Sequence, residues 1–273
     1  MNKLQIIKIH FLSILLCFCS AIFAQNSMSP QQMKTKTDSI LAEANVLYQY
    51  EKAAWITTDS AVSKKQLKNI LGPYLVYQLK DSMITIFMNR TMDACIYEAI
   101  YTPYLDVPTK QIVATRPLNA TEKRLREISG KIVQQIDEKK YPIRCSKGYN
   151  LNLQLIPYEK GYKLYILTGT SQSRVIPFGN DYIFFADQQG NITSWKPFHT
   201  RLIDQPTVID GNKVRSLSHS HRQEPFITAT DICTFRLYAP MYDQEDFSVY
   251  SPALSTYFKY TLKNNTIEIT ENP

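Results

Sequence analysis

The stretch that decides the fold is 119-NATEKRLREISGKIVQQIDEKK-140, followed by the alternating segment 151-LNLQL-155. In the first segment apolar side chains recur every three or four residues, which is the period of an amphipathic helix. Asn119 and Glu122 have the spacing of a capping box, so we expect the helix to begin there. In the second segment every other residue is apolar, which predicts a strand with one buried face. Together they predict an α+β fold.

Downstream of residue 155 the sequence continues in short alternating runs, with Gly, Asn and Asp residues at the breaks. One short helix is predicted over residues 228–238. The predicted strands cover residues 162–168, 181–187, 192–203, 214–221, 247–250, 256–262 and 267–269. We therefore expect a mainly antiparallel sheet with helices packed on it.

Upstream, the pattern predicts a helical N-terminal part followed by a hairpin. Apolar spacing favours helices over residues 30–54 and 62–71, the second ending at Gly72-Pro73. Strands are expected over residues 83–88 and 94–101. Three prolines make residues 102–118 a connecting region, so the predicted division is an N-terminal part of residues 25–115 and a C-terminal α+β domain of residues 116–273.

The first 24 residues have the composition of a secretory signal peptide. Two lysines and no acid precede an apolar run from Phe11 to Phe23, and Ala24 offers a small residue at the cleavage site. We expect export to the periplasm or the medium, with no stable membrane span after cleavage. Large residues precede Cys17 and Cys19, so the signal is not that of a lipoprotein.

Composition excludes several classes of protein. The 273 residues are 44% hydrophobic and 20% charged, which is typical of a globular chain. The net charge of +7 is not gathered into a basic block, so we expect no nucleic-acid partner. Beyond the signal peptide the cysteines are Cys95, Cys145 and Cys233, which permit at most one disulfide and one free thiol. Zinc-finger spacing, a P-loop and a G-x-S-x-G elbow are absent from the sequence.

One constellation points to chemistry. In 216-SLSHSH-221 the histidines His219 and His221 are two residues apart, so on a strand they share a face and can bind one metal ion. Asp231, at the start of the predicted short helix, is the expected third ligand. His199 and Glu224 are spare candidates. Histidine nitrogens with a carboxylate oxygen are typical of zinc, which is the cofactor we predict.

The string His219-x-His221, six residues, Thr228-x-x-Asp231 resembles the zinc signature of JAMM/MPN-plus metalloproteases. The resemblance implies that His219, His221 and Asp231 are metal ligands. It also implies that Thr228, in the place of the family's serine, stabilises the transition state. The activity it implies is metal-dependent hydrolysis of an amide bond.

The sequence departs from the family pattern at several positions. The family usually has seven residues in the spacer, and a proline where this chain has Arg222. The upstream glutamate that serves the family as general base has only Glu159 as a candidate here. The C-terminal half is also similar to uncharacterised secreted bacterial proteins that combine an H-x-H pair with a T-x-T-D string, and this second resemblance implies no function.

Other interpretations of the same residues stay open. Thr228 and Asp231 also have the spacing of a capping box. Cys233 is either a nucleophile near the histidines or a buried structural residue. Two functions follow: a zinc-dependent amide-bond hydrolase of the cell envelope, or a non-catalytic envelope module that binds a protein, peptide or glycan partner.

Overall fold

The computed structural model describes residues 28–102 and 106–272, so the predicted signal peptide of residues 1–24 lies outside the described residues. The chain forms two units, residues 1–37 and residues 38–273. Helix α2 (Pro30–Val62) begins in the first unit, where Ser29 and Gln32 exchange hydrogen bonds in a capping box. All other described elements belong to the second unit, and they confirm the predicted α+β class.

The first sheet of the second unit is antiparallel, in the order β1-β2-β3-β4, and a short strand β5 also pairs with β3. The predicted hairpin is confirmed as β2 and β3. The bounds of these strands are β1 (Leu71–Leu79), β2 (Ser82–Asn89), β3 (Ala94–Tyr101), β4 (Lys110–Ile112) and β5 (Arg116–Pro117).

The predicted helix over residues 62–71 is wrong. After Val62 the chain makes successive turns, with Leu67 N–H donating to the Lys64 carbonyl at 2.9 Å, and then enters β1. Gly72 lies in an irregularity of the β1–β2 ladder, where a Cβ would approach the Asn89 carbonyl oxygen to 2.3 Å. Gly72-Pro73 therefore marks a bulge on an edge strand and not the end of a helix.

The second sheet has the order β10-β9-β7-β6, and a separate pair joins β8 to β11. Their bounds are β6 (Tyr149–Tyr158), β7 (Gly161–Thr170), β8 (Val175–Gly179), β9 (Tyr182–Ala186), β10 (Ile192–Pro197) and β11 (Leu202–Pro206). The single strand predicted over residues 192–203 is wrong, because β10 and β11 belong to different sheets. The chain leaves the ladder at Phe198, whose N–H donates to the Asp181 carbonyl, and His199 lies in the break.

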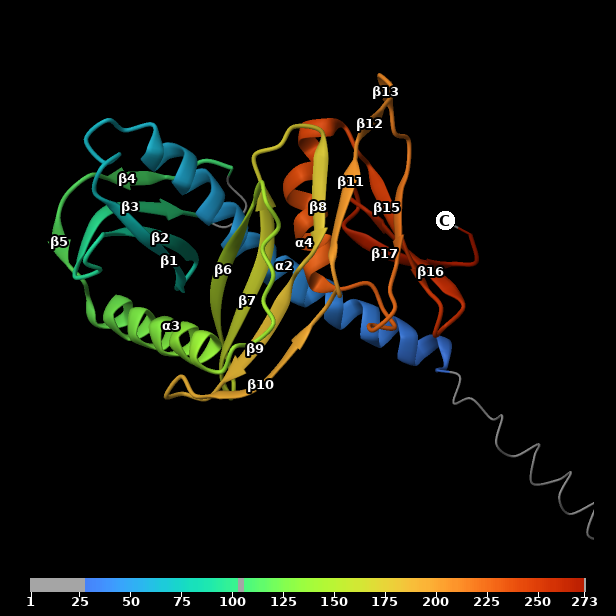
Figure 1. The fold of residues 1–273 in the computed structure, drawn as a ribbon, viewed down its shortest axis with the longest axis horizontal. Helices are drawn as coiled ribbons and strands as arrows, with labels where there is room; N and C mark the ends of the chain where they lie inside the picture. The colour runs from blue at the N-terminus through green and yellow to red at the C-terminus, as the bar shows by residue number, and fades with distance from the viewer. Residues whose placement is uncertain (1–27, 103–105, 273) are drawn as a thin grey trace, which may run out of the picture. The chain divides into compact units, whose positions relative to one another are not determined.

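Two helices cover opposite faces of these sheets (Figure 1). Helix α3 (Ala120–Glu138) packs Leu125, Ile128 and Ile132 into a core that both sheets share. Helix α2 packs the side chains of Leu47 and Tyr50, with their neighbours, against the other face. Residues on both sides of the predicted boundary at 115 and 116 contribute to these cores.

The C-terminal sheet has the order β14-β15-β16-β17. Strands β14 and β15 are parallel and helix α4 connects them, whereas the other pairs are antiparallel. Buried aromatic rings of Phe235, Phe247 and Tyr260 pack α4 on this sheet. The bounds are β12 (Val208–Ile209), β13 (Asn212–Lys213), β14 (Leu217–Ser220), α4 (Ala229–Tyr238), η1 (Ala239–Tyr242), β15 (Asp246–Ser251), β16 (Thr256–Thr261) and β17 (Thr266–Thr270).

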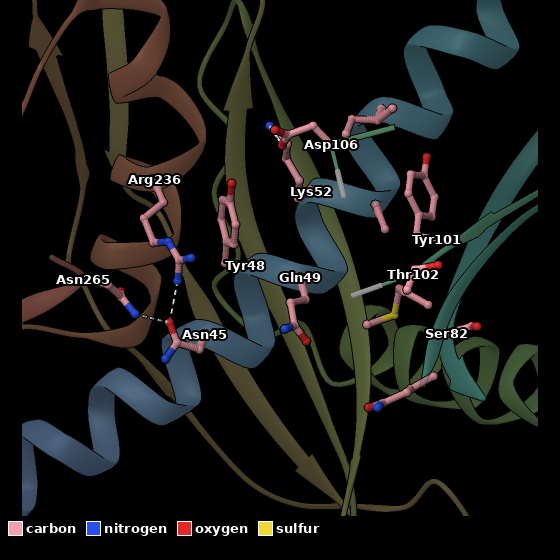
Figure 2. Close-up of a pocket in the computed structure, with 14 residues that line it drawn as sticks. Asn45, Tyr48, Gln49, Lys52, Ser82, Tyr101, Thr102, Asp106, Arg236 and Asn265 are labelled. Carbon is pink, nitrogen blue, oxygen red and sulfur yellow. Dashed lines mark hydrogen bonds and ion pairs between the residues drawn. The ribbon is translucent and has the colours of Figure 1, made fainter. Parts of the chain in front are cut away.

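The far end of α4 is anchored to α2 beside a pocket of about 420 Å³ (Figure 2). The Arg236 guanidinium lies 3.8 Å from the centre of the Tyr48 ring. It also donates to Asn45 Oδ1 at 2.6 Å, and the Asn265 amide donates to the same oxygen. These contacts fix the helix whose first turn carries Asp231.

Two further predictions concern membrane-spanning helices and disulfides. None of the described helices has a stretch long and apolar enough to cross a membrane. Among the described residues Cys95, Cys145 and Cys233 are all free thiols, so the one disulfide that the sequence permitted is not formed there.

Candidate metal centre

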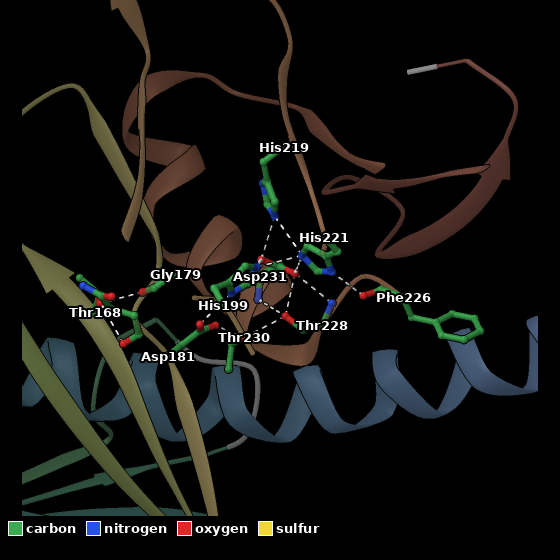
Figure 3. Close-up of polar contacts among 11 residues, drawn as sticks. Thr168, Gly179, Asp181, His199, His219, His221, Phe226, Thr228, Thr230 and Asp231 are labelled. Carbon is green, nitrogen blue, oxygen red and sulfur yellow. Dashed lines mark hydrogen bonds and ion pairs between the residues drawn. The ribbon is translucent and has the colours of Figure 1, made fainter. Parts of the chain in front are cut away.

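Four side chains from three elements converge at the N-terminal end of α4 (Figure 3). His219 lies on β14, His221 directly follows this strand, and Asp231 lies in the first turn of α4. His199 comes from the break between β10 and β11. One ligand atom of each residue lies within 4.8 Å of the others. The structure thus brings together the three residues of the motif and one of the two spare candidates.

The distances within this His–Asp cluster are those of atoms around a common centre. His221 Nε2 lies 2.9 Å from His199 Nε2 and 3.2 Å from His219 Nε2. Asp231 Oδ1 lies 3.3 Å and 3.2 Å from Nε2 of His199 and His219. In a tetrahedral zinc site, bonds of about 2.0–2.1 Å place neighbouring ligand atoms roughly 3.3 Å apart. The contacts of 2.9–3.3 Å within the cluster lie near this spacing, and the four residues form a group that could hold a metal ion.

The outer nitrogens of two imidazoles are held by hydrogen-bond acceptors. His199 Nδ1 lies 2.7 Å from Asp181 Oδ1, and His221 Nδ1 lies 2.6 Å from the Phe226 carbonyl oxygen. A carbonyl or a carboxylate only accepts, so both Nδ1 atoms carry the hydrogen. If both rings are neutral, the two Nε2 atoms present lone pairs to each other, and a proton or a metal ion between them would stabilise the contact. Metal-binding histidines have this type of outer contact.

The Asp231 carboxylate both caps α4 and contacts the imidazoles, and its capping oxygen Oδ2 also lies 3.1 Å from His221 Nε2. Its Oδ2 accepts from the Thr228 backbone N–H at 2.9 Å and from the Thr228 hydroxyl at 2.7 Å, which completes the predicted capping box. Its Oδ1 is buried, has no hydrogen-bond partner among the described residues, and faces the imidazoles of His199 and His219. The capping and ligand interpretations of this residue are therefore compatible.

Asp181, which the sequence did not indicate, links the cluster together. Its Oδ1 holds His199, and its Oδ2 accepts from the Thr230 hydroxyl. Thr230 in turn contacts the Thr228 hydroxyl at 2.9 Å. Asp181 follows Gly179-Asn180, a pair typical of turns, and Asn180 has the positive φ of 49° that such a turn requires. The local sequence therefore indicates only a turn. The fold and not a motif places it beside His199.

Burial and charge shift the pKa values of the cluster in opposite directions. Burial lowers the pKa of His199, but the charges of Asp181 and Asp231 outweigh it and hold that pKa well above its ordinary value. Burial raises the pKa of Asp231, but the three imidazoles hold it well below its usual range. For His219 burial dominates and its pKa is lowered. The buried Asp231 carboxylate thus depends on positive charge supplied within the cluster.

The remaining sequence candidates lie apart from the cluster or are occupied. Glu224 pairs with Lys196 at 2.7 Å, and Glu159 is exposed in the turn between β6 and β7. The Thr228 hydroxyl is engaged by Asp231 and Thr230. Cys233 is fully buried in the core beneath α2, which raises the pKa of its thiol well above the usual value, as expected for a structural cysteine.

Comparison of the chain with protein-family models, curated protein sequences and solved structures finds no match. The resemblance to the JAMM/MPN-plus signature therefore rests on the motif alone. The structure supports a His–Asp cluster that could hold a metal ion.

Proposed function

We propose that the chain binds one divalent metal ion through Nε2 of His199, His219 and His221 and Oδ1 of Asp231. A single observation carries this proposal. Two imidazoles with fixed Nδ1–H groups turn their Nε2 atoms toward each other at 2.9 Å, next to a carboxylate oxygen that has no hydrogen bond. Three imidazole nitrogens and one carboxylate oxygen favour zinc over magnesium or calcium, which prefer oxygen ligands.

A proton offers a second way to hold the same four groups together. A cationic His199 donates to His221 Nε2 and neutralises part of the charge on Asp181 and Asp231. One proton serves one nitrogen–nitrogen contact, however, whereas His221 Nε2 lies close to two other Nε2 atoms. A central ion accounts for both contacts, and metal analysis distinguishes the two arrangements.

Burial and the number of ligands favour a stabilising role for this ion. The four side chains are at most 4% exposed, and they fill a tetrahedral set without a water. The ion would hold β14, α4 and the β10–β11 break together. This role suits an exported binding module, with export proposed from the signal-like residues 1–24 and a protein, peptide or glycan of the envelope as the partner.

Amide-bond hydrolysis is the second candidate, and the H-x-H…T-x-x-D string favours it. When bound, zinc supplies a Lewis acid and an activated water at an open position. His199 lies outside the string, so this ring would have to withdraw to open that position. Thr228 would also have to release Asp231. Cleavage of a fluorogenic peptide mixture by zinc-loaded protein, lost in Asp231→Asn and reduced in Thr228→Val, would favour this candidate over the binding module.

Metal analysis of the purified full chain tests the main proposal. After growth with zinc and purification without chelators, we expect about one metal ion per chain by mass spectrometry. His221→Ala should lose most of it, whereas Glu224→Gln, a carboxylate near the motif but outside the cluster, should keep it. Wild-type protein that binds no added zinc, or a His221→Ala variant that keeps its metal, would overturn the proposal.

A further inference from the structure

A second pocket, of about 330 Å³, lies between α2, the β6–β7 strands and the C-terminal end of α4. It shares no residue with the His–Asp cluster. Its walls include the carboxylates of Glu51 and Asp59 and the rings of Trp55, Tyr74 and Tyr238, and no lysine or arginine is among its lining residues. Its volume is at the lower end of the range for small-molecule sites. The pocket is therefore acidic and aromatic.

Glu51 is a buried carboxylate without a cationic partner among the described residues. It is 2% exposed, and its Oε2 accepts from the Asn152 amide at 3.2 Å. Its Oε1 is buried and has no hydrogen-bond partner in the part of the chain that the structure describes. Burial raises the pKa of this carboxyl to about 7, against which the amides of Gln154 and Asn152 act. A positively charged donor would satisfy both its charge and its free oxygen.

The aromatic walls are held in place by their own contacts. Trp55 and Tyr238 meet edge to face with their ring centres 4.9 Å apart. The Tyr238 hydroxyl accepts from the Thr170 backbone N–H at 2.9 Å, and the Tyr74 hydroxyl donates to the Leu153 carbonyl. Aromatic faces attract cations, and do so most strongly where water is excluded.

The pocket of Figure 2 provides the contrast. There the chain supplies its own cations, since Arg236 lies over the Tyr48 ring and Lys52 pairs with Asp106 at 3.5 Å. The Glu51 pocket has the acid and the rings, but no lysine or arginine is among the described residues that line it. We propose that this pocket binds a primary ammonium group, which donates to Glu51 and lies against Trp55 and Tyr238.

The ammonium could come from a free amine or from a lysine side chain of a peptide, and the chemistry is the same for both. A primary ammonium is favoured over a quaternary one because Glu51 Oε1 needs an N–H donor. The inference deepens the binding module proposed above. Because it uses no metal ligand, the two proposals can fail separately.

Calorimetric titration of the full chain tests the inference, with benzylammonium, its neutral match benzyl alcohol, butylammonium and Nα-acetyl-lysine methylamide as probes. We expect saturable binding of the ammonium probes and none of benzyl alcohol. Tighter binding of the lysine derivative than of butylammonium assigns the peptide source, and the reverse assigns a free amine. Equal binding of benzyl alcohol and benzylammonium, or no saturable ammonium binding, would overturn the inference.

Variants locate the binding. Glu51→Gln keeps the size of the side chain and should weaken ammonium binding at least tenfold, and Trp55→Leu should also weaken it. Glu127→Gln, an exposed carboxylate on α3 outside the pocket, should bind as the wild type does. Thermal unfolding checks that each variant folds. Unchanged affinity in folded Glu51→Gln contradicts the inference, and metal content measured on the same samples tests the metal proposal independently.

Discussion

Helices α3 and α4 begin with the same local device and complete it differently. Each starts with a capping box whose acid, Glu122 or Asp231, is buried and bonds the N-cap backbone with one oxygen. At α3 the chain supplies the counter-ion, because Arg116 makes a two-point contact with Glu122 at 2.7 Å and binds Glu98 as well. At α4 three imidazoles surround the acid, and no lysine or arginine pairs with it among the described residues.

The difference indicates which buried charges are structural and which imply a ligand. Burial raises the pKa of Glu122, but the hydrogen bonds and charge of Arg116 outweigh that effect. The net result is a lowered pKa, and the charge of Glu122 is neutralised by a residue of the chain itself. The imidazoles around Asp231 turn Nε2 atoms toward one another, and its Oδ1 has no hydrogen-bond partner among the described residues. A closed set of charges needs nothing from outside, whereas the four side chains at α4 form a set that could hold a metal ion.

Metal removal gives the largest expected effect. An ion present at about a thousand times its dissociation constant stabilises by about 4 kcal/mol, so a chelator should lower the melting temperature of zinc-loaded protein by roughly 10 °C. As a control, the Arg116→Met variant should show the same fall in melting temperature on chelation, because the contacts of Arg116 with Glu98 and Glu122 do not involve the ion. The His221→Ala variant should show no fall on chelation, because it has already lost the metal. A melting temperature that stays constant while the metal is removed would contradict the stabilising role.

Removing the counter-ion at α3 should cost nearly as much. Arg116→Met leaves Glu98 and Glu122 without their cation, and we expect the free energy of unfolding in urea to fall by about 3 kcal/mol. Arg126→Met removes an exposed pair with Glu127 and should cost at most about 1 kcal/mol. Equal losses in the two variants would show that the Arg116 cluster is not a buried network in energetic terms.

Glu51 is the third case, a buried acid without a counter-ion among the described residues. Its pKa of about 7 in the folded chain exceeds the ordinary 4.5, so protonation stabilises the fold at low pH and that stabilisation is lost as pH rises through about 7. Between about pH 5 and about pH 8 the wild type should lose about 2–3 kcal/mol relative to Glu51→Gln. Urea unfolding at both pH values measures this. The same change in the free energy of unfolding between these pH values in both proteins would show that Glu51 is ionised over the whole range.

The smallest effect is expected from the outer contact of the His–Asp cluster. Asp181→Asn removes the charge that holds His199 and should weaken zinc binding about 10–100-fold without changing the stoichiometry at saturating zinc. Competition with a zinc-binding dye measures the affinity. Asp204→Asn, an exposed acid on β11, should leave it unchanged. An unaltered affinity in Asp181→Asn would mean that His199 is oriented without it.

Local signals predicted those parts of the fold in which neighbours in sequence decide the structure. Helix α3 follows from the Asn119–Glu122 spacing and its apolar stripe, and the shared face of His219 and His221 follows from strand alternation. Strand β1 was missed because Leu75, Val76 and Tyr77 form a short apolar run that helix and strand patterns share. Its pairing with β2 decided between them.

The candidate site could be predicted only in part for the same reason. Thr228 and Asp231 belong to one capping box, and His221 is close to them in sequence. His199 could be included only as a spare histidine, because its place depends on the break between β10 and β11. Asp181 gave no signal, since it reaches His199 only after β9 and β10 have paired.

The break that carries His199 has a consequence for the unfolded chain. An ion bound by His199 and Asp231 would close a loop of roughly 30 residues, much as a disulfide does. Unlike a disulfide, the ion leaves when its ligands separate, so the loop is closed in the folded chain and open in the unfolded one. The three described cysteines are free, so no disulfide among them closes a loop in the unfolded chain. The His–Asp cluster would then act as a reversible cross-link, whose strength the surrounding metal concentration sets.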